Sequence, residues 1–357
     1  MRNDHPPQSS AGMMNRVSIV ILNWNGKEFL RQFLPVLLEH TDLPGTEIVV
    51  ADNASTDDSV AFVENEHPGV KVIRLDKNYG FSGGYNRALE QIDSQYFLLL
   101  NSDIEVTPGW LEPLLETMDR HPETAACSPK IRDFYRRSHF EYAGAGGGYI
   151  DRYGYTFCRG RLFDHIEEDR GQYDDPVEVF WGTGACLMVR AGLYREAGGL
   201  DEQFFAHMEE IDLCWRLQRM GHTIRYVPGS MVYHVGGGTL QRGNPQKTFL
   251  NFRNNLLLIG KNLSGRHRRK VLFWRKVLDG ISAIRFLLQG AFGDFRAVLR
   301  AHGAYNGMKA GYRGTGEQNN LKKKDVIVTG IYPGSIVAEF FLNGRKQFDQ
   351  LRHWRRG

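Results

Sequence analysis

The chain has 357 residues, of which 41% are hydrophobic and 24% are charged, a composition typical of one large or two modest globular domains. Its net charge of +4 is too small to indicate a nucleic-acid-binding protein by itself. The four cysteines form no Cys-x-x-Cys pair, which argues against a zinc site or a dense disulfide framework and favours a reducing compartment. We expect residues 1–15 to be a disordered polar tail, and we expect neither a signal peptide nor a membrane-spanning helix.

Apolar strands alternate with amphipathic helices through the first third of the chain. Strands are predicted at 17–22, 47–52, 70–75, 96–101 and 124–131. Helices are predicted at 26–40, 57–67, 82–92 and 109–121. This alternation favours an α/β fold with a mostly parallel central sheet and helices on both faces.

The pattern changes after residue 131. Residues 132–180 are rich in Gly, Tyr, Arg and Asp and lack periodicity, so we interpret them as loops or a hairpin. An apolar segment with a helix is predicted at 182–199, a glycine-terminated helix at 209–221, and short strands at 223–228 and 231–235. From residue 246 the pattern is helical and basic, and residues 324–357 predict a strand or turn followed by a final basic helix.

Two motifs lie where predicted strands meet loops in the first half of the sheet. "VVADNASTDDS" places Asp52 and Asn53 at a strand end, where ligands of parallel sheets bind, although an Asx turn accounts for these residues about equally well. "DKNYGFSGGYNRAL" carries glycines before a helix, which lets backbone N–H groups approach a phosphate or sugar, or simply makes a flexible loop. It is not the Gly-x-Gly-x-x-Gly motif of dinucleotide-binding folds.

Two further motifs carry carboxylates and a histidine. "LLLNSD" ends a buried strand at Asp103, which suits a divalent cation, although a lone aspartate at such a place is more often a helix cap. In "MEEIDLCWRLQRMGH", Glu209 and Asp212 share one helix face, which is consistent with a site or with a solvated acidic turn. His234 in "VYHVGGGT" is either a cation ligand or a buried, hydrogen-bonded histidine.

In this order, these motifs resemble the family 2 glycosyltransferases, which have the GT-A fold. "IVILNWNG", "VVADNASTDDS", "KNYGFSGGYNRAL", "LLLNSD", "MEEIDLCWRLQRMGH" and "VYHVGGGT" match six family segments in sequence, and the likeness covers roughly residues 16–260. It is strongest to the rhamnosyltransferase-like subgroup that builds surface polysaccharides. The resemblance implies a catalytic domain at 16–245 and a helical, basic extension at 246–357.

The resemblance also implies roles for individual residues. The donor-binding residues would be Asn23, Asp52, Asn53, Asn78, Gly83, Asn86, Asn101 and Asp103. Asp103 and His234 would hold Mg²⁺ or Mn²⁺, and Trp181 and Gly182 would face the acceptor. Glu210 stands at the position of the catalytic base, with Glu209 or Asp212 as alternatives.

Two positions depart from the family pattern. Asn101 replaces the first aspartate of the metal motif, which keeps an oxygen donor but removes a charge. Glu210 replaces the commoner aspartate and extends the carboxylate by one methylene. Asn101 still offers an oxygen ligand to a cation, and Glu210 still offers a carboxylate that can act as a base.

The implied reaction is an inverting displacement that moves a sugar from a nucleotide donor to a glycan or lipid-linked acceptor. A dTDP-linked rhamnose is the first expectation for the donor and a UDP-hexose the second. A nucleotidyltransferase, which would need a basic triphosphate loop, and a degenerate, non-catalytic sugar-nucleotide-binding module are the alternatives. A dehydrogenase is disfavoured because the first strand lacks the glycine fingerprint.

The C-terminal third combines basic and large apolar residues. "KNLSGRHRRKVLFWRK" places Lys261, Arg275 and five other basic residues around Leu272, Phe273 and Trp274. This pattern suits the surface of an anionic membrane, or equally a packed helix pair with a solvated basic face. Because lipid-linked acceptors are common in the family, we expect peripheral attachment to the cytoplasmic face of the inner membrane, and no nucleic-acid partner.

Overall fold

A computed structural model describes residues 15–236, 244–311 and 327–351 of the chain. The predicted disordered tail, residues 1–15, lies outside these ranges except for Asn15, which begins the first strand.

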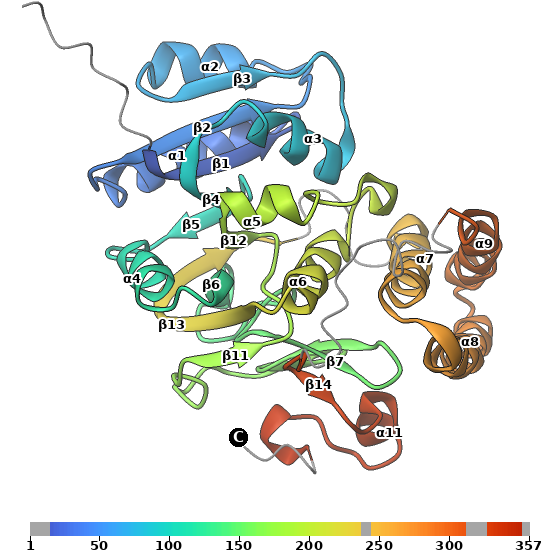
Figure 1. Ribbon diagram of the computed structural model, residues 1–357. Helices are drawn as coiled ribbons and strands as arrows, with labels where there is room; N and C mark the ends of the chain where they lie inside the picture. Colours follow the sequence, from blue (N-terminus) through green and yellow to red (C-terminus); the bar gives the residue numbers. More distant parts are fainter. Residues whose placement is uncertain (1–14, 237–243, 312–326, 352–357) are drawn as a thin grey trace, which may run out of the picture.

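The central sheet runs through the middle of the molecule (Figure 1). Among the described residues it contains β1 (Asn15–Asn23), β2 (Thr46–Asp52), β3 (Lys71–Arg74), β4 (Ser94–Leu100), β5 (Ile104–Val106), β6 (Thr124–Asp133), β11 (Val177–Val179), β12 (Cys186–Arg190) and β13 (Thr223–His234). The strand order is β11-β13-β6-β12-β4-β1-β2-β3, and β5 pairs with β13. Strands β1 to β4 are mutually parallel, whereas β12 runs antiparallel to both β4 and β6. The predicted short strands at 223–228 and 231–235 are one strand, β13, whose register shifts between Val227 and Met231.

A second, smaller sheet forms mainly in residues 132–180, which were predicted to be loops or a hairpin, and takes one strand from the segment at 324–357 that was predicted to begin with a strand or turn. It contains β7 (Gly148–Asp151), β8 (Thr156–Cys158), β9 (Arg161–Leu162), β10 (His165–Ile166) and β14 (Ile331–Tyr332). The prediction was incomplete because these strands have only two to four residues each, too few for an alternating pattern.

Helices cover both faces of the central sheet. The helical elements are α1 (Lys27–Glu39), α2 (Ser59–Glu66), α3 (Gly80–Leu89), α4 (Glu112–Arg120), α5 (Ala191–Glu196), η1 (Glu202–Phe204), α6 (Glu209–Arg219), α7 (Pro245–Asn262), α8 (Gly265–Leu288), α9 (Phe292–Met308), α11 (Ile336–Phe341) and η2 (Phe348–Gln350). Alternate β1 residues face opposite sides: Val20 packs with buried residues of α3, α5 and α6, and Ile19 with those of α1, α2 and α4. The sheet is therefore buried on both faces, as a near-continuous run of apolar residues predicts.

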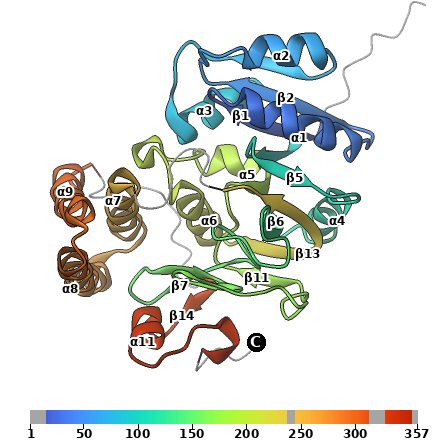
Figure 2. The same cartoon turned by 180° about the vertical axis from the view of Figure 1, so that it is seen from behind.

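The C-terminal region does not pack as a separate unit. Helices α7, α8 and α9 gather at one edge of the molecule, and both views place α7 between α6 and the outer pair (Figure 1, Figure 2). The chain then returns to the second sheet, where β14 pairs parallel with β7 and Phe348 packs against Tyr149 and Phe157. In place of the predicted final basic helix, the described residues contain only the short α11 and η2, and residues 352–357 lie outside them.

Candidate active site

The carboxyl ends of β1 and β2 bring Asn23 and Asp52 side by side, because the two residues are register partners in parallel strands. The Asn23 amide donates to Asp52 Oδ1 over 3.2 Å and to Ser55 Oγ over 3.0 Å. The Ser55 backbone N–H donates to the second Asp52 oxygen over 3.1 Å. Asn23 Oδ1 is buried and has no hydrogen-bond partner among the described residues, so this strand end keeps one unused acceptor.

Asn53 and Asn78 build the glycine-rich loop before α3 and bind each other. The Asn53 amide donates to Asn78 Oδ1 and to the Gly80 carbonyl, and its oxygen accepts from the Tyr79 N–H. Gly80 has a φ of +71°, and a Cβ there would lie 2.9 Å from the Phe205 ring. Only glycine fits this turn. Both the amide nitrogen and the amide oxygen of Asn53 form hydrogen bonds that hold the backbone of the loop.

Gly83 and Asn86, on α3, face the turn that precedes η1. Asn86 binds both backbone groups of Leu200, donating to the carbonyl over 2.8 Å and accepting from the N–H over 2.9 Å. A Cβ on Gly83 would approach Tyr79 and Arg87 within 3.0 Å. Two of the predicted donor-binding residues therefore use their space and polarity to fix neighbouring chain segments.

Asp103 and His234 meet because β5 pairs with the end of β13, which places Ile104 opposite His234. Their closest atoms, Asp103 Oδ1 and His234 Nε2, are 3.2 Å apart, and both side chains are buried. The other ring nitrogen, Nδ1, lies 3.5 Å from Glu141 Oε1. Burial opposes both charges, but the ion pair lowers the pKa of Asp103, and the two carboxylates raise the pKa of His234 to about 10.

The Asp103–His234 pair fits a divalent cation in its donor atoms and spacing. Two ligand atoms that bind one ion at right angles and at about 2.1 Å are about 3.0 Å apart, close to the observed separation. Among the described residues there is no group of three or more His, Cys, Asp or Glu side chains arranged to hold a metal ion. This protein pair would therefore need further oxygen ligands from a substrate or water.

Glu209 and Glu210 form the first turn of α6, and each has a buried carboxylate oxygen, Oε2, without a hydrogen-bond partner in the described part of the chain. Burial raises the pKa of Glu210 to about 7. Burial, and secondarily the charge of Glu210, raises the pKa of Glu209. Two adjacent carboxylates with unused acceptors in a dry environment are the arrangement expected of a general base.

Backbone contacts tie Glu210 to the strand end that carries the metal motif. The Asn101 N–H donates to the Ala185 carbonyl over 2.9 Å. A Cβ on the preceding residue, Gly184, would lie 3.5 Å from Glu210 Cβ and in contact with the Phe81 ring. Glu210, Asn101 and Asp103 are therefore grouped at the carboxyl end of β4.

Asp212 shares α6 with Glu210 but belongs to a saturated ion-pair network. It is fully buried and accepts from Arg216 over 2.8 Å, from Lys261 over 2.8 Å and from Asn262 over 2.7 Å. Although burial alone would raise the pKa of Asp212, these donors lower it. Both carboxylate oxygens of Asp212 accept hydrogen bonds, and two of the donors lie on α7. This placement favours a structural role for Asp212 over that of a base.

The loop between η1 and α6 is strained and is held by α7. Phe205, His207 and Met208 have φ values of +66°, +70° and +76°, a conformation that side chains with a Cβ rarely adopt. The Asn254 amide lies 2.9, 2.8 and 2.7 Å from the carbonyl oxygens of Phe204, Ala206 and His207. This clamp fixes the direction in which α6 begins and so positions Glu210.

Trp181 and Gly182 are buried between the two sheets. The Trp181 indole N–H donates to the Tyr149 carbonyl over 3.1 Å, and the ring covers Gly148 so closely that a Cβ there would overlap it. A Cβ on Gly182 would meet Leu187 and Ser128 within 3.0 Å. These positions favour packing, and the acceptor-side role stays a prediction.

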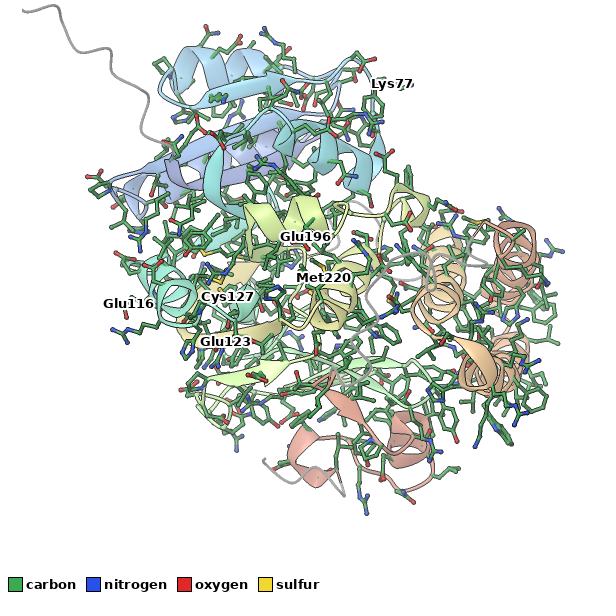
Figure 3. The ribbon with its side chains drawn as sticks, in the orientation of Figure 1. Lys77, Glu116, Glu123, Cys127, Glu196 and Met220 are labelled. Atoms are coloured by element: carbon green, nitrogen blue, oxygen red, sulfur yellow. The ribbon has the colours of Figure 1, made fainter. Side chains whose placement is uncertain are left out.

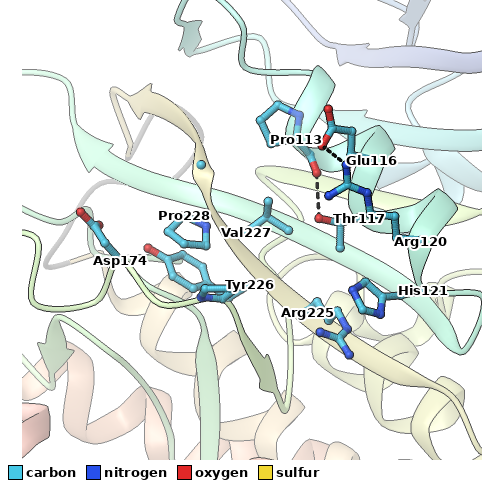
Figure 4. Close-up of a pocket in the computed structure, with 12 residues that line it drawn as sticks. Pro113, Glu116, Thr117, Arg120, His121, Asp174, Arg225, Tyr226, Val227 and Pro228 are labelled. Atoms are coloured by element: carbon cyan, nitrogen blue, oxygen red, sulfur yellow. Dashed lines mark hydrogen bonds and ion pairs between the residues drawn. The ribbon is translucent and has the colours of Figure 1, made fainter.

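A cavity of about 400 Å³ opens between α4 and β13 (Figure 4). Residues from α4, from the 225–229 segment of β13 and from the loop at Asp174 line it. Some of its polar groups pair with each other, as Figure 4 shows for Glu116 with Arg120 and for Thr117 with the Pro113 carbonyl. None of the predicted site residues lines this cavity, so it is not the candidate active site.

Three residues near the site were not predicted as part of it. Glu141 lies in a segment without periodicity, and Asn254 lies on a helix of the basic C-terminal third. Lys261, predicted to be one of several basic surface residues, points inward, where it bridges Asp201 and Asp212. No local pattern signals these contacts, because each partner is distant in sequence.

The fold places the chain in a class of protein, the GT-A glycosyltransferases. Solved structures with this architecture include GalNAc-T7 with UDP, GalNAc and Mn²⁺ (TM-score 0.54, 16% identity, 70% of this chain and 48% of that one). They also include S. aureus TarS 1–349 in complex with UDP-GlcNAc (TM-score 0.51, 19% identity, 85% of this chain and 90% of that one). At these identities the likeness concerns the fold alone.

The chain belongs to glycosyl transferase family 2, whose profile matches residues 18–196. It is 25% identical over 305 residues to the N-acetylglucosaminyl-diphospho-decaprenol L-rhamnosyltransferase of Mycobacterium tuberculosis, covering 81% of this chain and 93% of that protein. It is 28% identical over 239 residues to the pre-mycofactocin glycosyltransferase of the same organism, covering 64% of this chain and 45% of that protein. The resemblance to family 2 and to its rhamnosyltransferase-like members is thus confirmed.

Proposed function

We propose that this protein transfers a sugar, with inversion, from a nucleotide-diphosphate donor to a hydroxyl of a glycan or lipid-linked acceptor. The observation that carries the proposal is the grouping of Glu210 with Asp103 and His234 at the carboxyl end of β4. A family 2 glycosyltransferase needs a base on one side of the anomeric carbon and charge stabilisation at the diphosphate on the other. Glu210 would supply the base, and Asp103 and His234 would hold the cation that stabilises the diphosphate.

Glu210 is the general base of the proposed reaction. Its unpartnered Oε2 would accept the proton of the acceptor hydroxyl as the hydroxyl oxygen attacks the anomeric carbon and the bond to the diphosphate breaks. A pKa near 7 suits a base that operates at neutral pH. The neighbouring Glu209 has a pKa that is raised by burial and secondarily by the charge of Glu210, so its carboxyl favours the neutral form beside the base.

Asp103 and His234 are the proposed protein ligands of Mg²⁺ or Mn²⁺. When bound, the cation would neutralise negative charge on the departing diphosphate. Asn23 Oδ1 and the Asp52 carboxylate at the neighbouring strand ends are the proposed contacts of the nucleotide base. Asn53, Asn78, Gly83 and Asn86 would act indirectly, by shaping the donor loop.

The donor and the acceptor are proposed from the relatives. The M. tuberculosis protein that is 25% identical is named for L-rhamnose transfer to a decaprenol-linked sugar, which favours a dTDP-linked rhamnose over a UDP-hexose and a lipid-linked acceptor. An acceptor of that kind also favours a peripheral position on the cytoplasmic face of the inner membrane. No helix in the described ranges has the length and hydropathy needed to cross a membrane.

A thermal-shift panel, combined with a turnover assay, tests this proposal against a non-catalytic binding module. UDP-, dTDP- and GDP-sugars are each added with and without Mn²⁺, and a donor at about 100 times its Kd stabilises the fold by about 2.7 kcal/mol. We expect a rise in melting temperature with a dTDP- or UDP-sugar that is larger with Mn²⁺. No shift with any sugar nucleotide would contradict the proposal, and a shift without any turnover would favour the binding module.

A further inference from the structure

Helix α8 exposes a continuous row of large apolar side chains. The row, called here the α8 stripe, consists of Phe273, Trp274, Val277, Ile281, Ile284 and Leu288. Phe273 is 61% exposed, Ile281 59% and Leu288 83%. From Phe273, steps of four, four, three and four residues keep the row on one side of the helix over about 22 Å. A contiguous exposed patch of this size on a folded protein marks an interaction surface.

The opposite side of α8 is fixed to the rest of the protein, so the stripe cannot rotate inward. Val271, Arg275, Asp279 and Ala283 are buried and lie half a turn around the helix from the stripe. Arg275 donates to Asn255 of α7 over 2.6 Å and to Asp279 over 2.7 Å, and Asp279 lies 3.1 Å from His302 of α9. A buried polar network of this kind specifies one orientation of the helix.

Positive charge accompanies the stripe. Residues 265–308 contain nine Arg and Lys residues but only two Asp residues. Asp279 is buried in the network just described, and Asp294 accepts a hydrogen bond from Thr248 over 2.6 Å. Arg266, Arg269 and Lys270 are exposed in the first turns of α8, where Arg266 and Lys270 lie within the arc of the helix that the stripe occupies and Arg269 lies beside it. The outer surface therefore combines an apolar row with unopposed cations at one end.

We propose that the α8 stripe and these three basic residues dock on the surface of an anionic lipid bilayer. The helix would lie in the interface, with the stripe among the acyl chains and Arg266, Arg269 and Lys270 against lipid phosphates. Both views place α8 and α9 at the outer edge of the molecule, where a flat surface can reach them (Figure 1, Figure 2). The observations on α8 do not depend on the chemistry of the candidate active site. The proposal rests on the proposed function only in that a lipid-linked acceptor gives the protein a reason to bind a membrane.

Vesicle co-sedimentation of the full chain tests this proposal. Vesicles of phosphatidylcholine alone are compared with vesicles in which about a third of the lipid is phosphatidylglycerol, each at low and at high salt. We expect binding to the anionic vesicles that weakens with salt. Ile281→Asp combined with Ile284→Asp should reduce the partition coefficient about tenfold or more, because two apolar side chains would be replaced by anions.

Matched variants separate lipid docking from other outcomes. Ile327→Asp, at a position 86% exposed outside α8, should bind vesicles like the unaltered protein. Arg266→Gln with Arg269→Gln and Lys270→Gln should remove the preference for phosphatidylglycerol. If the Ile281 and Ile284 variant loses its cooperative melting, Phe273→Ser with Trp274→Ser replaces it.

Three results would overturn the proposal. The first is no binding of the unaltered protein to anionic vesicles. The second is equal binding by the stripe variants. The third is a dimer in light scattering that the stripe variants dissociate, without vesicle binding, which would assign the stripe to self-association. The vesicles contain no donor or acceptor, so a failure of vesicle binding is distinct from a failure of the thermal-shift panel.

Discussion

The proposed base Glu210 carries a cost in stability, because its carboxylate oxygen Oε2 is buried. Its folded pKa of about 7 lies above that of an exposed glutamate, so the folded state holds the proton more tightly than the unfolded chain does. The free energy of unfolding therefore falls as pH rises from about 4.5 to about 7. A neutral amide at this position avoids that loss.

Glu210→Gln should accordingly stabilise the protein at pH 8 and do so less at pH 5. The expected gain at pH 8 is on the order of 1–3 kcal/mol. Urea unfolding at the two pH values measures it, and Glu196→Gln, an exposed position on α5 labelled in Figure 3, is the control. Equal stability of the Glu210→Gln variant and the unaltered protein at both pH values would show that burial does not perturb Glu210.

We expect Asn101 to affect how tightly the proposed metal pair, Asp103 and His234, holds a cation. An amide offers an oxygen but no charge, and ligand charge is one of the main determinants of divalent-cation affinity. Asn101→Asp should therefore lower the Mn²⁺ concentration needed for half-maximal activity, by about tenfold. Titrating Mn²⁺ at saturating donor measures this midpoint. An unchanged midpoint would place Asn101 outside the cation's environment, whereas loss of activity in Asp103→Ala would still identify the carboxylate that matters.

At the scale of single elements, α7 controls where α6 begins. Asn254 donates to three carbonyls of a loop whose backbone adopts left-handed conformations. Without it, the Ala206 and His207 carbonyls would lose this donor, whereas the Phe204 carbonyl would keep Arg253 and the Ala206 N–H. The strain of this loop persists only while α7 holds it.

Asn254→Ala should lower both the free energy of unfolding, by about 1–3 kcal/mol, and kcat, since Glu210 would lose its fixed position. Asn251→Ala, on the same helix and half-buried, is the matched control. Steady-state kinetics and urea unfolding provide the two readouts. A variant that loses stability but keeps kcat would show that the clamp is structural only.

The elements that the sequence predicts are those whose signals are local. The strands β1, β2 and β4 and the helix α6 follow from runs of apolar residues and their period, and Asp52 and Asp103 follow from their places at strand ends. Glu210 was identified only through the family resemblance. Glu141 and Asn254 were not predicted, because their partners lie about 90 and about 50 residues away in the sequence. A strand or turn was predicted where β14 lies, but its pairing with the distant β7 was not. Asn53 and Asn86 were identified as motif residues, but the sequence does not show that their side-chain amides form hydrogen bonds to the backbone of neighbouring segments.

The whole molecule depends on its C-terminal third for more than surface contact. Lys261 and Asn262 of α7 neutralise and satisfy Asp212, and Phe348 fills the aromatic cluster of the second sheet. The sequence pattern changes at the predicted boundary, residue 245, but side chains from both sides of this boundary pack together.

A chain truncated after residue 245 should fail to fold cooperatively. Removing Lys261 leaves a buried charge without one of its partners, which costs about 3–5 kcal/mol, out of a total stability of about 5–15 kcal/mol for a typical domain. Thermal unfolding followed by circular dichroism measures the effect, with a chain ending at residue 351 as the control. A cooperative transition at the temperature of the full chain would show that the catalytic region is independent.

The rate of sugar transfer by Glu210→Gln tests the central claim most directly. With the donor identified by thermal shift, release of nucleoside diphosphate in the presence of an acceptor lipid extract reports turnover, and the donor's Kd is measured separately. We predict that turnover falls by about 10²- to 10⁴-fold while donor affinity is kept, and that Glu196→Gln matches the unaltered protein. Near-normal turnover by Glu210→Gln would contradict the assignment of the base, and with it the proposed mechanism.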